Sequence, residues 1–199
     1  MALLPANDYL GQPYFAFLSD TLNSILIMKF YAFFLTMAFT SLFGCSLRAD
    51  PLAIGAKAPD VTAPDENGQP VDFAKVYAHR MTLVYFYPKA GTPGCTAQAC
   101  SLRDGIADLK ADGVTILGVS HDTAEAQKKF KEKYNLPFTL IADHDGKVIQ
   151  AFGVPTIIFG IAKRQSFLIK DGKVVWRSLN AETKGHAEEV RKAVEALRG

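Results

Sequence analysis

Two of the chain's three cysteines, Cys95 and Cys100, lie five residues apart in the segment YFYPKAGTPGCTAQAC. The segment opens with strand-forming residues, and Thr92 followed by Pro93 is a typical start for a helix. Cys95 then occupies the third helical position, where unpaired backbone N–H groups and the helix dipole favour thiolate over thiol. The spacing therefore predicts a nucleophilic thiol at Cys95, with the Thr92 hydroxyl beside it to hold a substrate oxygen.

Metal chemistry is not expected from the other metal-binding residue types. A structural zinc site needs four ligands, and the sequence offers no second cysteine pair to complete one. The histidines are scattered, and we expect each of them at the surface or in a turn: His79, His121, His144 and His186. Cys100 has a second interpretation, as a small buried residue on the helix without a chemical role.

The elements that must position Cys95 begin with strands. Continuous apolar runs predict strands over 81–88, 114–120 and 138–143, buried on both faces. The range 164–179 reads as two strand-like halves joined by Asp171-Gly172, a strong hairpin signal. The sheet is therefore predicted to be mixed rather than entirely parallel.

Helices alternate with these strands, which is the pattern of an α/β domain. They are predicted from near residue 92 to 113, over 123–134 and over 186–199, and turn-rich residues 55–73 predict an N-terminal hairpin. This order predicts a thioredoxin-like three-layer fold with a mixed central sheet, built from residues 50–199.

Residues 1–49 precede this domain and differ from it in composition. Met28-Lys29 is followed by an uncharged run over 30–43, which resembles the basic and apolar regions of an export signal that begins at an internal methionine. If Met1 is the true start, residues 25–44 are also long enough to span a bilayer. Either reading predicts an exported, periplasmic or membrane-anchored protein of the bacterial envelope rather than a cytoplasmic one.

The third cysteine, Cys45, ends this apolar stretch. Leu42 and Gly44 resemble the residues that precede the lipidated cysteine of bacterial lipoproteins. The competing interpretation is cleavage after Ala49, which would discard Cys45.

Charge gives no sign of a nucleic-acid partner. The formal net charge of the chain is +2, and its clear basic cluster, residues 127–133, is expected on the solvent side of a helix. Nucleic-acid binding needs a concentrated basic face, so we expect none.

The segment 85–104 resembles the active-site motif of the peroxiredoxins. Pro88, Thr92 and Cys95 fall into the peroxiredoxin pattern P-x-x-x-T-x-x-C. The sequence of the segment is similar to that of the bacterioferritin-comigratory (PrxQ-like) subfamily. The resemblance continues in APD at 58–60, FTLIAD at 138–143 and RQSFLIKDGKV at 164–174, and it covers roughly residues 52–198.

This resemblance implies reduction of hydrogen peroxide or an organic hydroperoxide, with no metal, haem or flavin as cofactor. Cys95 would attack a peroxide oxygen as thiolate and become a sulfenic acid. Thr92 would hydrogen-bond the peroxide, and Arg164 would bring a fixed positive charge to the thiolate and the transition state. Pro88 would shape the pocket and shield the sulfur.

The resemblance also implies that Cys100 resolves the sulfenic acid as a disulfide, which thioredoxin or a similar dithiol then reduces. In a regular helix, residues five apart have Cα atoms about 8–9 Å apart. A disulfide tolerates about 7 Å, so the first turn must unwind for Cys95 and Cys100 to bond.

Two other functions remain open at this point. One is a membrane-tethered, peroxide-responsive redox sensor or interaction module, in which oxidation of Cys95 alters binding. The other is a thioredoxin-type oxidoreductase, which the absence of a C-x-x-C motif disfavours. The expected oligomeric state is a monomer or weak dimer.

Overall fold

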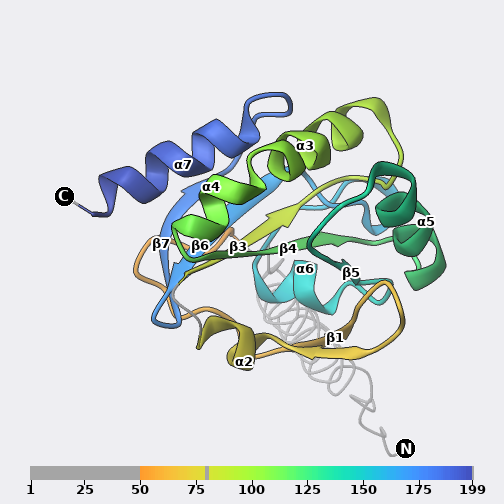
Figure 1. The fold of residues 1–199 in the computed structure, drawn as a ribbon. Coiled ribbons are helices and arrows are strands. Elements are labelled where there is room, and N and C mark those ends of the chain that lie inside the picture. Colours follow the sequence, from red (N-terminus) through yellow and green to blue (C-terminus); the bar gives the residue numbers. More distant parts are fainter. Residues whose placement is uncertain (1–49, 79–80, 199) are drawn as a thin grey trace, which may run out of the picture. The chain divides into compact units, whose positions relative to one another are not determined.

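A five-stranded mixed sheet forms the centre of the computed structural model, which describes residues 50–78 and 81–198 (Figure 1). The strands are β3 (Met81–Phe86), β4 (Val114–Ser120), β5 (Thr139–Ala142), β6 (Gln165–Lys170) and β7 (Lys173–Ser178). Their order is β5-β4-β3-β6-β7; β3, β4 and β5 are parallel, and β6 and β7 are antiparallel to their neighbours. The predicted export or anchor segment and Cys45 lie outside the described residues.

Helices and a small hairpin cover the sheet. The helices are α2 (Phe73–Tyr77), α3 (Pro93–Asp104), α4 (Ile106–Ala111), α5 (Ala124–Tyr134), α6 (Lys147–Ala151) and α7 (His186–Ala196), with a 3-10 turn at Ile158–Gly160. The hairpin pairs β1 (Thr62–Pro64) with β2 (Pro70–Asp72). None of these helices is long and apolar enough to cross a membrane.

The central strand β3 is buried along its whole length because both of its faces are covered. Leu83 and Tyr85 pack into the cluster beneath α3, α4 and α7, whereas Val84 and Phe86 pack into the cluster above α2 and α6. Figure 1 shows the result, with α3, α4 and α7 on one side of the sheet and α2, α6 and β1 on the other. The predicted α/β, thioredoxin-like fold with a mixed sheet is confirmed.

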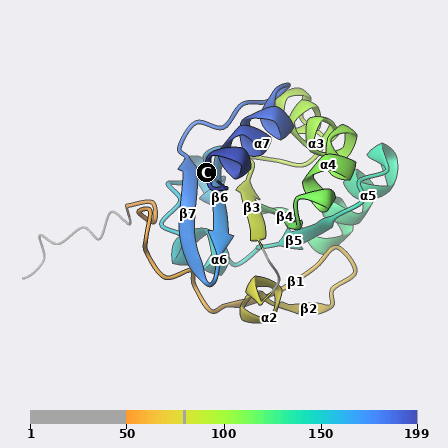
Figure 2. The ribbon, with the colours of Figure 1, turned by 60° about the vertical axis from the view of Figure 1, so that its left-hand side comes forward.

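The helix predicted from near residue 92 to 113 is wrong in one respect, because it breaks at Gly105 into α3 and α4. A Cβ atom on Gly105 would lie 2.7 Å from the Cβ of Ala187, so α7 passes against the chain here. Figure 2 shows α7 alongside α3 and α4. This close approach lies at the C-terminal end of α3, and Ala187 N–H also donates to Ser101 Oγ, earlier on the same helix, at 3.1 Å.

The hairpin predicted at Asp171-Gly172 is confirmed. Both residues have positive φ, 51° and 69°, as a two-residue turn between twisted strands requires. The turn lets β7 return antiparallel along β6 and fixes where β6 ends.

Candidate active site

Cys95 lies in the first turn of α3, as predicted. Thr92 is the N-cap with an extended backbone, φ −74° and ψ 152°, and Pro93 begins the helix. No acidic side chain lies in this first turn, so nothing there opposes the positive end of the helix dipole. The Cys95 side chain is only 1% exposed, which shelters the sulfur from bulk solvent.

The loop between β3 and α3 is held by hydrogen bonds at its start and in its middle. Tyr87 N–H donates to the Val119 carbonyl at 3.1 Å, and Ala90 N–H donates to Asp122 Oδ2 at 2.8 Å. Pro88, which the resemblance places in the pocket wall, is half-buried between these two anchors. These two hydrogen bonds fix the position of the loop that leads into the first turn of α3.

The Thr92 hydroxyl does not cap the helix, although Thr92 occupies the N-cap position. It donates to the Lys89 carbonyl at 3.0 Å. Its oxygen lone pairs stay available, so in this arrangement Thr92 can accept a hydrogen bond from a protonated peroxide oxygen. To donate to a peroxide, the hydroxyl must first leave Lys89.

Arg164 reaches Cys95 from a distant part of the sequence. β6 pairs antiparallel with β3, with Gln165 opposite Phe86, so the start of β6 lies beside the end of β3. Arg164 precedes this strand and places Nη2 3.4 Å from Cys95 Sγ. A Cβ on Gly94 would lie 3.3 Å from the same Nη2, so a glycine there leaves room for the guanidinium.

Gln98 and His186 extend the site beyond the residues predicted from sequence. The Gln98 carbonyl oxygen accepts from Arg164 Nη1, and Gln98 Nε2 lies 3.0 Å from His186 Nδ1. The other ring nitrogen of His186 lies 2.9 Å from Ser166 Oγ. A polar chain thus runs from β6 through α7 and α3 to the Cys95 sulfur.

The prediction that His186 lies at the surface or in a turn is wrong, because its side chain is fully buried. His186 stands four and eight residues before Val190 and Val194, which are both in the core. This helical spacing is the sequence signal that would have placed His186 on the apolar face of α7, and it was not used. His79 lies outside the described residues, whereas His144 is exposed and His121 half-buried.

Burial, with a smaller effect from the charge of Arg164, lowers the pKa of His186 to about 3. The imidazole is therefore neutral around pH 7 and does not act there as a general acid. Burial likewise raises the pKa of Tyr85, which packs in the same cluster as Cys95, well above its usual value. His186 and Tyr85 therefore bring no charge to the surroundings of Arg164 around pH 7.

Cys100 lies on α3 and is half-buried, and both Cys95 and Cys100 are free thiols on a formed helix. Their predicted pairing stays a prediction. Among the residues that the structure describes, no group of three or more His, Cys, Asp or Glu side chains is placed to hold a metal ion.

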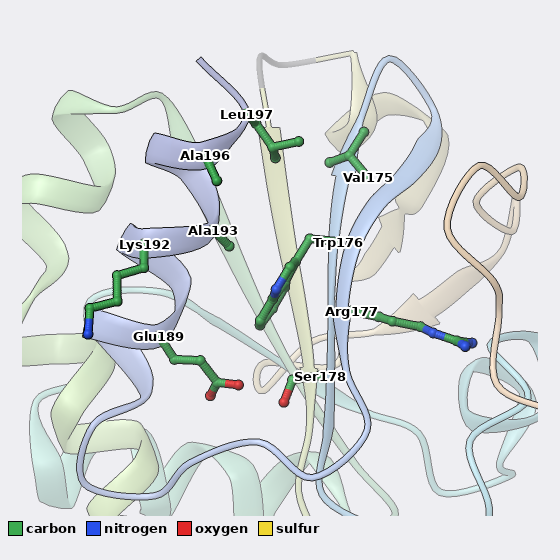
Figure 3. Close-up of a pocket in the computed structure, with 9 residues that line it drawn as sticks. All are labelled: Val175, Trp176, Arg177, Ser178, Glu189, Lys192, Ala193, Ala196 and Leu197. Atoms are coloured by element: carbon green, nitrogen blue, oxygen red, sulfur yellow. The ribbon is translucent and has the colours of Figure 1, made fainter. Parts of the chain in front are cut away.

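A separate groove of about 460 Å³ lies between β7 and α7 (Figure 3). Trp176 faces Ala193 across it, and Glu189 and Ser178 lie at one end. None of the residues predicted for the site lines this groove. The predicted residues Thr92 and Cys95 lie instead at the start of α3.

A buried thiol at a helix start, 3.4 Å from a guanidinium, is placed to act as a nucleophile toward an electrophilic atom. On a thioredoxin-like sheet, this arrangement defines the class of thiol-dependent redox enzymes. Residues 54–177 match the AhpC/TSA family. The chain belongs to this family and is a thiol peroxidase of the Bcp/PrxQ type of peroxiredoxin, as its relatives show.

Three relatives illustrate the similarity. Peroxiredoxin Bcp of Escherichia coli (strain K12) is 49% identical over 105 residues, which are 53% of this chain and 67% of that protein. The structure of peroxidoxin BcpB from Mycobacterium tuberculosis has a TM-score of 0.70 and 30% identity, covering 74% of this chain and 99% of that one. A structure of the bacterioferritin comigratory protein of Xanthomonas campestris, whose subject is alkyl peroxide reduction, has a TM-score of 0.66 and 27% identity. The similarity covers 75% of this chain and 100% of that one.

Proposed function

We propose that Cys95 is the residue that reduces the peroxide. The observation that carries this proposal is the 3.4 Å contact between Arg164 Nη2 and Cys95 Sγ at the start of α3. The thiolate attacks one peroxide oxygen, the O–O bond breaks, and the departing oxygen takes a proton to leave as water or an alcohol. The sulfur is oxidised to sulfenic acid and the peroxide is reduced. Arg164 stabilises the negative charge that moves from sulfur to the leaving oxygen.

The proposed substrates are hydrogen peroxide and organic hydroperoxides. The similarity to the Xanthomonas campestris protein, whose structure concerns alkyl peroxide reduction, supports the second group. In the first step Thr92 accepts a hydrogen bond from the peroxide, and Pro88 limits access of water to the sulfur.

The proposed second step forms a disulfide between Cys95 and Cys100. The Cys100 thiol attacks the sulfenic sulfur and one water molecule leaves, so oxidation passes from one sulfur to the pair. A dithiol such as thioredoxin then reduces the disulfide by exchange. The position of both thiols on α3 supports this step, provided that the first turn opens.

We further propose that the protein works in the bacterial envelope, because the sequence before residue 50 holds the uncharged run 30–43. A cytosolic thioredoxin does not reach an exported domain. The physiological reductant is then a dithiol protein on the same side of the membrane.

The test is sustained peroxide consumption by catalytic amounts of the protein with thioredoxin, its reductase and NADPH. Cys95→Ser should abolish turnover, because serine does not take up the oxygen. Cys100→Ser is the matched control from the same helix, and it should still consume about one equivalent of peroxide in a single turnover. More than trace turnover by Cys95→Ser would show that another residue is the nucleophile.

A further inference from the structure

The buried polar chain behind Cys95 has a defined direction, because one of its members can only donate. A guanidinium has no acceptor, so Arg164 Nη1 must donate to the carbonyl oxygen of Gln98. The amide group of Gln98 is thereby fixed, with its NH2 facing His186 Nδ1 at 3.0 Å. Nδ1 must accept, so the proton of His186 lies on Nε2 and is donated to Ser166 Oγ at 2.9 Å.

The surroundings of His186 favour this single state. Gln98, Ser166 and His186 are all fully buried, so none of them exchanges its partner for water. The edge of the ring also meets Tyr85, with ring centroids 5.8 Å apart. A proton on Nδ1 would oppose the amide NH2 of Gln98, and burial together with the nearby charge of Arg164 disfavours the doubly protonated ring. His186 is thus a permanent acceptor toward α3.

The alternative orientation of Gln98 would harm the site. If the amide turned over, its NH2 would face the Arg164 guanidinium, and two donors would oppose each other. The guanidinium would then have to move. Because Nη1 and Nη2 belong to one rigid fork, this movement would also displace Nη2 from Cys95 Sγ.

We propose that His186 is a positioning residue, which holds the Gln98 amide in the one orientation that aligns Arg164 with the Cys95 sulfur. This inference rests on the proposed role of Cys95. His186 touches neither the sulfur nor a substrate position and acts only through Gln98 and Arg164. Helix α7, outside the recognised motif, thus contributes to the reactivity of the first turn of α3.

The experiment uses the full chain with Cys45→Ser and Cys100→Ser, so that Cys95 is the remaining thiol. Two rates are measured across pH: alkylation of Cys95 by iodoacetamide, and single-turnover oxidation by hydrogen peroxide. His186→Leu removes the acceptor, so we expect the alkylation profile to move to higher pH and the peroxide rate to fall about ten-fold. Arg164→Ala should change both in the same direction and serves as the positive control.

Conservative variants separate orientation from packing. The oxygen of asparagine takes the place of Nδ1, so His186→Asn should keep both rates within about two-fold of the parent. His186→Gln has its polar group at the position of Nε2 and should behave like His186→Leu. Val190→Ala, on the same face of α7, loses buried apolar contacts and should lower stability without moving either profile.

The proposal is overturned if His186→Leu matches the parent in both rates while Arg164→Ala does not, or if Val190→Ala shifts them equally. If His186→Leu does not fold, the comparison of His186→Asn with His186→Gln decides, and equal rates overturn the proposal. Alkylation involves no peroxide. The alkylation rates would therefore still test the role of His186 if Cys95 proved not to reduce peroxide.

Discussion

At the scale of single residues, the site depends on one guanidinium that contacts two acceptors. The fork of Arg164 reaches Cys95 Sγ and Gln98 together. A lysine at this position would be a point charge without the fork that serves both acceptors. The neutral imidazole of His186 supports this arrangement at a cost, because a buried histidine gives up its proton.

That cost predicts a pH dependence of stability. The pKa of His186 is about 3 in the fold and near 6.5 as an ordinary value. Between these pH values the unfolded chain binds a proton that the fold does not, so the free energy of unfolding falls as pH falls below 6.5. The slope from His186 is at most about 1.4 kcal/mol per pH unit, and its contribution is complete above pH 6.5.

The measurement is urea denaturation of the reduced parent and of His186→Asn between pH 7 and pH 4. Stability of the parent should fall more steeply with acid than that of His186→Asn. Val190→Ala provides the control, since it lowers stability by a similar amount at every pH. Parallel curves for the parent and His186→Asn would show that the buried histidine is not the group responsible.

At the scale of elements, the residues next to Cys95 were enough to predict its position at the start of a helix. The positions of Arg164 and Gln98 depend on contacts between distant parts of the chain. Thr92 and Pro93 mark the start of α3 by their own backbone preferences, so the position of Cys95 was readable from neighbouring residues. Arg164 was predicted only through resemblance, because it is separated from Cys95 by 69 positions. The role of Gln98 was missed, since it depends on which residue of α7 packs against α3.

The same packing links the two helices during the proposed disulfide step. Gln98 lies between Cys95 and Cys100, and Ala187 N–H donates to Ser101 Oγ at 3.1 Å. A disulfide from Cys95 to Cys100 requires the first turn of α3 to unwind, which would take Gln98 away from His186. Oxidation is therefore expected to loosen the start of α7 as well.

Hydrogen exchange should report this opening. After one equivalent of peroxide, amides of residues 94–101 and of Ala187 should exchange markedly faster, whereas the strands of the sheet change little. Cys100→Ser forms no disulfide, so its sulfenic acid should persist while α3 keeps slow exchange. Equal acceleration in Cys100→Ser, or no Cys95–Cys100 bond in the mapped parent, would point to direct reduction of Cys95 by an external thiol.

At the scale of the whole molecule, two parts of the chain have different purposes in the proposed function. The family match over 54–177 lies within the described domain, and the uncharged run 30–43 lies before it. The domain holds the groups proposed for peroxide chemistry, and under the proposed envelope location the preceding sequence would determine which reductant the domain meets. The N-terminal segment would then bear on the second half of the proposed cycle, in which the Cys95–Cys100 disulfide is reduced in the compartment that the domain occupies.

The mature N-terminus tests this division directly. Protein isolated from its native host should be in the envelope fraction, and intact-mass measurement should show a start at Cys45 with added lipid, a start after Ala49, or an uncleaved membrane-bound chain. Cys45→Ser separates the first two outcomes, because it removes the lipid and leaves cleavage after Ala49 unchanged. Replacing Phe34 and Leu35 by aspartate interrupts the apolar run and should keep the protein in the cytoplasm. If the parent protein is soluble, cytoplasmic and still has its intact N-terminus, the proposed location is wrong. The expected reductant is then the cytosolic thioredoxin system.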